Sequence, residues 1–384
     1  MRFLFTCGGT AGHINPAVGV AGRLLEILPD AEFLFIGAEG MMEMELVPRE
    51  GFNIRGIQVG NLSRSLSLSG VKHNVKTLKK LLRGSAEAKR ILKEFSPDAA
   101  VGTGGYVCYP VLREAHKLGI PTLVHESNAV PGLTTKLLAR SVDCVMVGFE
   151  NAKENYPAGA NVVFTGTPVR TGFNGSSNSN SDAGLTRARA RKRLGLPEDR
   201  PLLVSVWGSL GSDHINGLMP EFLKLVCEKQ EFCVIHSAGK RGYAKLASAL
   251  DAVCGPEAAR KAKGADCREY VYDMPLVMAA ADLVMCRSGA STLGELAALG
   301  TPALLVPSPN VTNHHQEKNA RLLEAAGAAE VLLEGGFDAA GLYDAASKLL
   351  ADGARRAKMS GAMRAAGAPD AAERIADLIL GYVK

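Results

Sequence analysis

The chain has 384 residues, 47% hydrophobic and 22% charged, which is typical of a globular protein with room for two domains. Its net charge of +5 is too small to indicate a nucleic-acid-binding protein, although a local basic patch could still face an anionic substrate or a membrane. Eight cysteines occur without a CxxC pair or a His/Cys ligand spacing, and no apolar run approaches the roughly 18 residues of a membrane span. We therefore expect neither disulfides, nor zinc, nor a spanning helix.

The first half of the chain alternates between apolar strand-like runs and helix-compatible segments. A strand at 2–7 leads into a glycine-rich turn at 8–13, a helix from about 15 to 28 and a strand at 32–36. This order is the typical opening of a doubly wound α/β domain. Further strands are expected near 53–57, 98–101, 121–125, 142–147 and 161–165. The alternation with helices predicts a parallel sheet.

The second half repeats the pattern after a stretch at 172–184 that is rich in Ser, Asn and Gly and is interpreted as a linker. Strands are expected at 201–207 and then near 232–237, 268–272, 282–287, 302–306 and 329–333. Ligands of such sheets bind at the carboxyl ends of the strands. Two doubly wound domains with a site in the cleft between them are therefore predicted.

The stretch 286–296 carries the most specific local signal of the second half. A short apolar strand ends in small residues, and a helix from about 292 to 299 follows at once. Backbone N–H groups and the positive end of a helix favour a phosphate at such a turn, and Glu295 could accept hydrogen bonds from a ribose. A buried helix start without any ligand is the alternative.

Seven motifs occur in order along the chain, at 8–17, 104–106, 125–134, 166–170, 208–211, 286–290 with Glu295, and 313–316 with 319–320. Together they resemble the bacterial cell-wall N-acetylglucosaminyltransferases that convert lipid I into lipid II. The resemblance covers nearly the whole chain. It implies two Rossmann-like domains of the GT-B fold and a peripheral enzyme on the cytoplasmic face of the cell membrane.

The resemblance also implies a division of the chain. Residues 1–165 would form an acceptor-binding and membrane-binding domain, 166–200 a hinge, and 201–367 the domain that binds UDP-N-acetylglucosamine. Residues 368–384 would form a last helix that packs back on the N-terminal domain.

By this resemblance the enzyme moves N-acetylglucosamine, with inversion, from UDP-N-acetylglucosamine to the 4-hydroxyl of the muramoyl sugar of lipid I. Its partners would be these two substrates and an anionic membrane surface, with no nucleic acid. No Asp-x-Asp motif occurs in the chain, which agrees with a site that needs no metal and no cofactor. Neutral donors at a helix N-terminus would stabilise the departing diphosphate instead.

The family implies a donor site built from both halves of the chain. Its candidate residues are Thr10, Gly12, Asn128, Arg170, Ser209, Val271, Ala290, Ser291, Thr292, Glu295, His315 and Gln316. Ser209 and 290–292 would hold the diphosphate, Glu295 the ribose, the main chain of Val271 the uracil edge, and His315 and Gln316 the sugar hydroxyls. Gln316 could also be a polar residue on an exposed helix start.

Two glycine turns in the first half are the candidates for the acceptor diphosphate, namely Gly8, Gly9 and Thr10, and Gly104, Gly105 and Tyr106. Either turn could also be only a tight connection. His13 is the candidate catalytic base because a histidine titrates in the right range and a helix start keeps it neutral. Glu126 or His125 could serve instead, and His13 could be a structural residue of the loop.

A basic segment at 71–90, preceded by a Ser/Leu-rich stretch at 62–68, is the candidate membrane contact. Its cationic residues are Lys72, Lys76, Lys79, Lys80, Arg83, Lys89 and Arg90, interleaved with apolar residues. An ordinary solvated helix face is the alternative.

Three positions depart from the family pattern. Ala11 replaces a common glycine and requires a negative φ, and Ser127 and Thr167 replace longer or different polar side chains.

Two other functions stay open: a UDP-N-acetylglucosamine 2-epimerase, which uses the same architecture, and a nucleotide-sugar binding module without catalysis.

Overall fold

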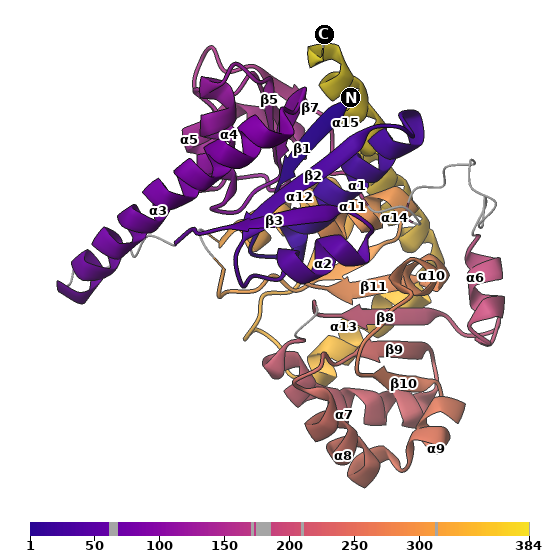
Figure 1. Cartoon of the computed structure of the whole chain (residues 1–384). Helices are drawn as coiled ribbons and strands as arrows, with labels where there is room; N and C mark the ends of the chain where they lie inside the picture. The colour runs from indigo at the N-terminus through magenta and orange to yellow at the C-terminus, as the bar shows by residue number, and fades with distance from the viewer. Residues whose placement is uncertain (61–67, 170–172, 174–185, 209–210, 312–313, 384) are drawn as a thin grey trace. The chain divides into compact units, whose positions relative to one another are not determined.

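The computed structural model describes residues 1–60, 68–169, 173, 186–208, 211–311 and 314–383, with the side chains of 68–81 left out. The chain divides into two compact units (Figure 1). Unit 1 comprises Met1–Thr171 together with Ala368–Lys384, and unit 2 comprises Gly172–Gly367.

Unit 1 contains a seven-stranded parallel sheet in the order β3-β2-β1-β4-β5-β6-β7. Its strands are β1 (Arg2–Thr6), β2 (Glu32–Ala38), β3 (Asn53–Ile57), β4 (Ala99–Gly102), β5 (Thr122–Glu126), β6 (Cys144–Val147) and β7 (Val162–Phe164). Its helices are α1 (Ala11–Ile27), α2 (Glu43–Arg49), α3 (Leu68–Phe95), α4 (Cys108–Lys117), α5 (Leu133–Leu138), the 3₁₀ helix η1 (Glu150–Asn155) and α15 (Ala371–Tyr382).

The first strand explains why this sheet is central to the unit. Phe3, Leu4 and Phe5 are all fully buried, because the core lies on both faces of β1. The rings of Phe5 and Phe35 stack at 5.3 Å across β1 and β2. The strand order reverses between β1 and β4, so the loops that follow these two strands lie side by side at the carboxyl edge.

Unit 2 contains a six-stranded parallel sheet in the order β10-β9-β8-β11-β12-β13. Its strands are β8 (Leu202–Val206), β9 (Cys233–Ser237), β10 (Ala265–Arg268), β11 (Leu283–Cys286), β12 (Ala303–Leu305) and β13 (Ala329–Val331). Its helices are α6 (Arg187–Arg193), α7 (Asp213–Lys229), α8 (Tyr243–Cys254), α9 (Glu257–Ala262), α10 (Met274–Ala280), α11 (Ala290–Leu299), α12 (His315–Ala325), α13 (Ala339–Ala351) and α14 (Gly353–Ala366). Here the order reverses between β8 and β11.

Two parallel sheets of the doubly wound type were predicted from the sequence, and this prediction is confirmed. One strand was placed wrongly: we expected 268–272, whereas β10 is Ala265–Arg268. The apolar triplet at 270–272 suggested a strand, but Tyr272 is 83% exposed and its ring meets that of Tyr270 edge-on. The linker expected at 172–184 falls almost wholly on residues outside the described ranges.

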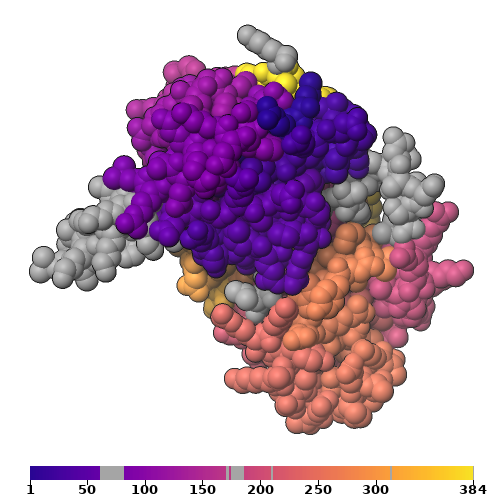
Figure 2. Space-filling view, in the orientation of Figure 1, coloured from indigo at the N-terminus to yellow at the C-terminus, as the bar shows by residue number. Residues whose placement is uncertain are grey.

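The C-terminal helix α15 packs on α1 within unit 1, although it follows unit 2 in the sequence. In Figure 2 the yellow C-terminal residues lie beside indigo and purple residues of the first part of the chain. Ile375, Ala376 and Ile379 are fully buried in the core beside α1. At its end, the Nδ2 of Asn161 donates a hydrogen bond of 2.8 Å to the hydroxyl of Tyr382. The amphipathic pattern of this helix thus completes the core of unit 1.

A buried polar network links the middle of the sheet in unit 2 to the loop after β8. Nδ1 of His236 is 2.9 Å from Oγ of Ser205, which also accepts from Nε1 of Trp207 at 2.8 Å. Nε2 of His236 is 3.1 Å from Oδ1 of Asn216. Burial lowers the pKa of His236 from its ordinary value to about 3.

Shortening the side chain of Ile379 should test the packing of α15. Ile379→Ala leaves a cavity in the core of unit 1 and should lower its free energy of unfolding by about 2–5 kcal/mol. Asp377→Ala, an exposed change on the same helix, should have little effect. Hydrogen exchange of the amides of α1 and α15, followed in increasing urea, measures the free energy of unfolding of both variants. Equal protection in the two variants would contradict the packing.

The neutral state of His236 predicts how the stability of unit 2 depends on pH. The unfolded chain binds a proton on this histidine below about pH 6.5, whereas the folded protein does so only near pH 3. The free energy of unfolding should therefore fall as the pH drops from 6.5 toward 3. Fluorescence of Trp207, the only tryptophan of the chain, reports urea unfolding.

The matched pair for this experiment is His236→Gln and His214→Gln, because His214 is exposed. The slope between pH 6.5 and 4 should flatten in His236→Gln and persist in His214→Gln. A slope unaffected by His236→Gln would rule out this histidine as its source.

Candidate active site

His13 lies in the first turn of α1, at the carboxyl edge of β1. Its Nδ1 is 2.8 Å from the carbonyl oxygen of Gly8 and 3.5 Å from Oγ1 of Thr10. A carbonyl oxygen only accepts hydrogen bonds, so the contact with Gly8 places the proton of a neutral imidazole on Nδ1. The lone pair is then on Nε2, which is the nitrogen that can accept a proton from a substrate.

Glycines at 104 and 105 make room for this arrangement. A Cβ at Gly104 would lie 2.5 Å from Cδ2 of His13, and a Cβ at Gly105 would lie 2.4 Å from the oxygen of Gly8. Both residues have positive φ, +118° and +93°, where other residues are strained. The two loops can therefore approach closely enough for the N–H of Gly8 to donate to the oxygen of Gly104 at 3.1 Å.

A buried carboxylate lies beneath the same loop. Oε2 of Glu43 accepts from the N–H of Gly9 at 3.0 Å, and Oε1 accepts from the N–H of Ala38 at 2.9 Å. The N–H of Gly8 is also used, by Gly104. The N–H groups of Gly8 and Gly9, which we expected to cradle a phosphate, both donate within the protein in this conformation, and their role in acceptor binding stays a prediction.

Glu126 and His125, the alternative bases, are both buried at the end of β5. The carboxylate of Glu126 accepts four hydrogen bonds, of 2.9 to 3.1 Å, from the N–H and Nδ2 of Asn128, the N–H of Gly132 and Oγ1 of Thr135. The two ring nitrogens of His125 contact Gly166 and Ser127, and burial lowers its pKa. These contacts organise the loop 127–132, and a role of either residue as a base stays a prediction.

The residues that depart from the family pattern fit their positions. Ala11 is the first residue of α1, and non-glycine residues with positive φ in the described ranges are limited to Ser96, Gln230 and His314. Oγ of Ser127 lies 3.2 Å from Nδ1 of His125. Thr167 lies close to Gly148: a Cβ at Gly148 would be 2.3 Å from Oγ1 of Thr167 and would clash with it.

In unit 2 the turn 287–289 between β11 and α11 lies beside the end of β8, because Cys286 is in register with Val206. Oγ of the fully buried Ser288 donates to the oxygen of Gln316 at 2.7 Å, and Nδ2 of Asn319 donates to the oxygen of Ser288 at 3.3 Å. The side chain of Gln316 reaches back, with Oε1 2.9 Å from the N–H of Ser308. The turn and the start of α12 are therefore held together.

Arg287 connects this turn to its neighbours. Nη2 donates to Oγ of Ser212 at 2.9 Å, and Nη1 donates to the oxygen of Val306 at 3.1 Å and to the carboxylate of Glu334. The guanidinium also lies over the ring of Trp207, 5.5 Å from its centroid. One side chain thus fixes the loops that follow β8, β11 and β12.

The remaining predicted donor residues divide between the units. Val271, Ala290, Ser291, Thr292, Glu295, His315 and Gln316 belong to unit 2, and Thr10, Gly12 and Asn128 belong to unit 1. Ser291 and Thr292 are partly exposed in the first turn of α11, whereas Glu295 is buried one turn further. Arg170 and Ser209 lie outside the described residues.

Glu43 and Arg287 were missed by the sequence analysis. Arg287 was inside a quoted motif, and its position directly after β11 was the signal that could have found it. Glu43 contacts a loop 34 residues away in the sequence, and no local pattern predicts that contact.

The basic segment considered for membrane contact forms α3, a helix of 28 residues. The side chains of Lys72, Lys76, Lys79 and Lys80 lie outside the described residues. Further along, Leu82 is 65% exposed, Arg83 and Lys89 are exposed, and Arg90 pairs with Glu94 at 2.6 Å. Within the described ranges, no helix is both long and apolar enough to cross a bilayer.

Comparison with protein families gives two matches in chain order. The N-terminal domain of glycosyltransferase family 28 matches residues 3–147, and the C-terminal domain of the same family matches residues 202–375.

Among curated proteins, the chain is 41% identical to the UDP-N-acetylglucosamine–N-acetylmuramyl-(pentapeptide) pyrophosphoryl-undecaprenol N-acetylglucosamine transferase of Acetivibrio thermocellus, over 100% of this chain and 99% of that protein. It is 42% identical to the enzyme of the same name from Caldanaerobacter subterraneus, over 92% of each chain.

Among solved structures, MurG from Acinetobacter baumannii superposes with a TM-score of 0.74 at 26% identity, over 99% of both chains. A putative UDP-N-acetylglucosamine 2-epimerase from Listeria monocytogenes shares the fold, with a TM-score of 0.65 at 15% identity, over 97% of this chain and 94% of that one. The chain therefore belongs to glycosyltransferase family 28, in the family of the N-acetylmuramyl-(pentapeptide) pyrophosphoryl-undecaprenol N-acetylglucosamine transferases.

Proposed function

We propose that this protein transfers N-acetylglucosamine from UDP-N-acetylglucosamine to the 4-hydroxyl of the muramoyl sugar of lipid I, with inversion, to give lipid II for peptidoglycan synthesis. The observation that carries the proposal is the 41% identity with a transferase of this activity along the whole chain. A 2-epimerase is the weaker candidate, because its likeness at 15% identity extends to the fold alone.

His13 is the base in this proposal. Its Nδ1 is fixed by Gly8, so Nε2 takes the proton from the acceptor hydroxyl as that oxygen attacks the anomeric carbon of the donor. The bond from this carbon to the diphosphate breaks on the opposite face, which inverts the configuration. Glu126 holds Asn128 and the loop around it and takes no proton in this scheme.

The donor would bind at the carboxyl edge of unit 2. The N-terminus of α11 offers backbone N–H groups and a partial positive charge to the diphosphate, which gains negative charge as it leaves. Ser291 and Thr292 lie in this first turn, and Glu295 is proposed for the ribose. By the resemblance, Arg170 would contact the nucleotide. Ser209, Val271 and His315 keep the roles that the family implies, and Gln316 would contact the sugar.

The acceptor would bind near the glycine loops of unit 1. Because Gly8 and Gly9 donate internally, Thr10, Gly104, Gly105 and Tyr106 remain the candidates for its diphosphate. Tyr106 is 51% exposed and is available for such a contact. We further propose that α3 brings the protein to the cytoplasmic face of the cell membrane, where a polyprenyl-linked acceptor resides.

The activity is tested by incubating the protein with labelled UDP-N-acetylglucosamine and a short-chain lipid I analogue. Formation of the β-1,4-linked disaccharide product supports the proposal. Isomerised or hydrolysed donor would support the epimerase instead, and binding without turnover would indicate a module without catalysis.

Replacing His13 should separate chemistry from binding. His13→Ala should lower kcat by about 10²- to 10⁴-fold, because general base catalysis is lost, while the Kd for UDP-N-acetylglucosamine changes little. His116→Ala is the matched control, since His116 is exposed on α4. A kcat for His13→Ala within twofold of the control would move the base to another residue.

Replacing Arg287 should instead affect the donor. Arg287→Ala releases the loops after β8, β11 and β12 and should raise KM for UDP-N-acetylglucosamine by about tenfold or more. Arg287→Lys should not restore it, because an ammonium cannot reach Ser212, Val306 and Glu334 together. An unchanged KM in Arg287→Ala, with Arg355→Ala as control, would contradict this positioning role.

A further inference from the structure

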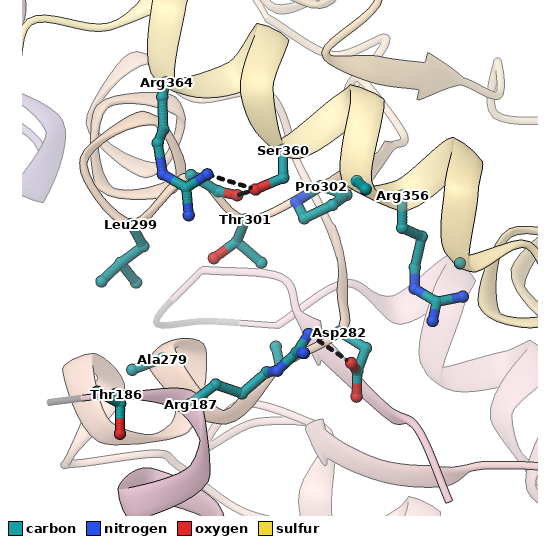
Figure 3. Close-up of a pocket in the computed structure, with 14 residues that line it drawn as sticks. Thr186, Arg187, Ala279, Asp282, Leu299, Thr301, Pro302, Arg356, Ser360 and Arg364 are labelled. Carbon is teal, nitrogen blue, oxygen red and sulfur yellow. Dashed lines mark hydrogen bonds and ion pairs between the residues drawn. The ribbon is translucent and has the colours of Figure 1, made fainter.

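A cavity of about 650 Å³ lies in unit 2, away from the candidate donor site (Figure 3). Its lining includes Asp282, directly before β11, and Pro302, directly before β12. The cavity is therefore at the amino edge of the parallel sheet, whereas the turn 287–289 is at the carboxyl edge. Its volume is in the range of about 300–1,000 Å³ typical of small-molecule sites.

The cavity is lined by cationic and hydroxyl groups. Arg187 of α6 and Arg356 and Arg364 of α14 contribute guanidinium groups, and Thr186, Thr301 and Ser360 contribute hydroxyls. Figure 3 shows side chains of α6 below and of α14 above the same space.

Asp282 is the only acidic residue of the lining, and its carboxylate is already neutralised. Oδ1 accepts from Nη1 of Arg187 at 2.8 Å, and Oδ2 accepts from Nη1 of Arg191 and from the N–H of Leu202, both at 2.8 Å. Arg191 lies behind the lining and is buried. The net charge of the wall is therefore positive.

Arg364 is held in place by two contacts. Its side chain lies against the backbone of Gly300, where a Cβ would come within 2.4 Å of Nε, and its Nη1 donates to Oγ of Ser360 at 2.9 Å. Ser360 in turn donates to the oxygen of Gly300 at 2.7 Å. Nη1 of Arg356 donates to the oxygen of Leu349 at 2.9 Å and to the oxygen of Leu350. A guanidinium has five N–H donors, so Arg356 and Arg364 both keep donors for a ligand.

We propose that this cavity binds a phosphate-bearing anion of about the size of a diphosphate. Guanidinium groups of α6 and α14 would each take one phosphate of a diphosphate, and charge-assisted hydrogen bonds of this kind are among the strongest in proteins. The same chemistry is offered by a soluble phosphorylated compound and by the headgroup of an anionic lipid.

The bound anion would connect α6 with α14. Helix α6 is the first described helix after the chain enters unit 2, and α14 is the last before the chain leaves it at Gly367. An anion held by Arg187 and Arg364 would therefore brace the two ends of the unit 2 segment against each other.

The test is a titration of the full chain, saturated with UDP-N-acetylglucosamine, with inorganic pyrophosphate by isothermal titration calorimetry. We expect a pyrophosphate site whose affinity Arg364→Gln lowers by about tenfold or more. Arg355→Gln is the matched control, because Arg355 is on the same helix but pairs with Glu330 outside the cavity. Absence of binding, or equal binding by both variants, would overturn the proposal.

A second experiment distinguishes the two sources of the anion, a soluble phosphorylated compound and the headgroup of an anionic lipid. Co-sedimentation with vesicles of phosphatidylcholine, with and without phosphatidylglycerol, is compared for Arg364→Gln and Arg355→Gln. A loss specific to Arg364→Gln and to phosphatidylglycerol identifies a lipid headgroup, and pyrophosphate binding without such a loss identifies a soluble anion.

Both variants are first compared by fluorescence of Trp207 during urea unfolding, so that a folding defect is recognised. If Arg364→Gln is less stable than the control, Arg187→Gln replaces it in the same titrations. In that variant the carboxylate of Asp282 still accepts hydrogen bonds from Arg191 and from the N–H of Leu202. Undiminished binding in that variant would equally overturn the proposal.

Discussion

The close approach of the loops after β1 and β4 is the constraint on which the first half of the site depends. The N–H of Gly8 donates to Gly104, and the oxygen of Gly8 accepts from His13, so one residue joins both loops to the proposed base. A side chain at Gly104 or Gly105 would push the loops apart. The reversal of strand order between β1 and β4 brings the loops together, and the glycines allow the final approach.

In unit 2 the loops at the reversal of strand order are also held close together, but by a different type of contact. Its strand order reverses between β8 and β11, but a guanidinium, Arg287, ties the neighbouring loops together. In unit 1 the corresponding support is a carboxylate, Glu43, whose charge opposes a phosphate at Gly9. The carboxylate at the turn of unit 1 and the positive end of α11 in unit 2 favour placing the nucleotide diphosphate in unit 2.

The sequence predicted the alternation of strands and helices well, because buried parallel strands are continuous apolar runs and glycine marks the turns that follow them. It also placed His13 beside a glycine loop, since that relation is local. The sequence could not predict that the N–H groups of Gly8 and Gly9 donate within the protein, because their acceptors, Gly104 and Glu43, are brought close only by the fold. For the same reason the sequence left Glu126 open as a base. The four hydrogen bonds that its carboxylate accepts become visible only in the three-dimensional structure.

The pair β8 and β11 is held by polar contacts at both of its ends. At the amino edge, Asp282 before β11 accepts from the N–H of Leu202 at the start of β8. At the carboxyl edge, Arg287 after β11 donates to Ser212 beyond β8. Such contacts are costly to break, because each leaves a buried or half-buried charged group with one hydrogen-bond partner fewer. The two strands should therefore move as one rigid element, with the candidate donor turn at one edge and the arginine-lined cavity at the other.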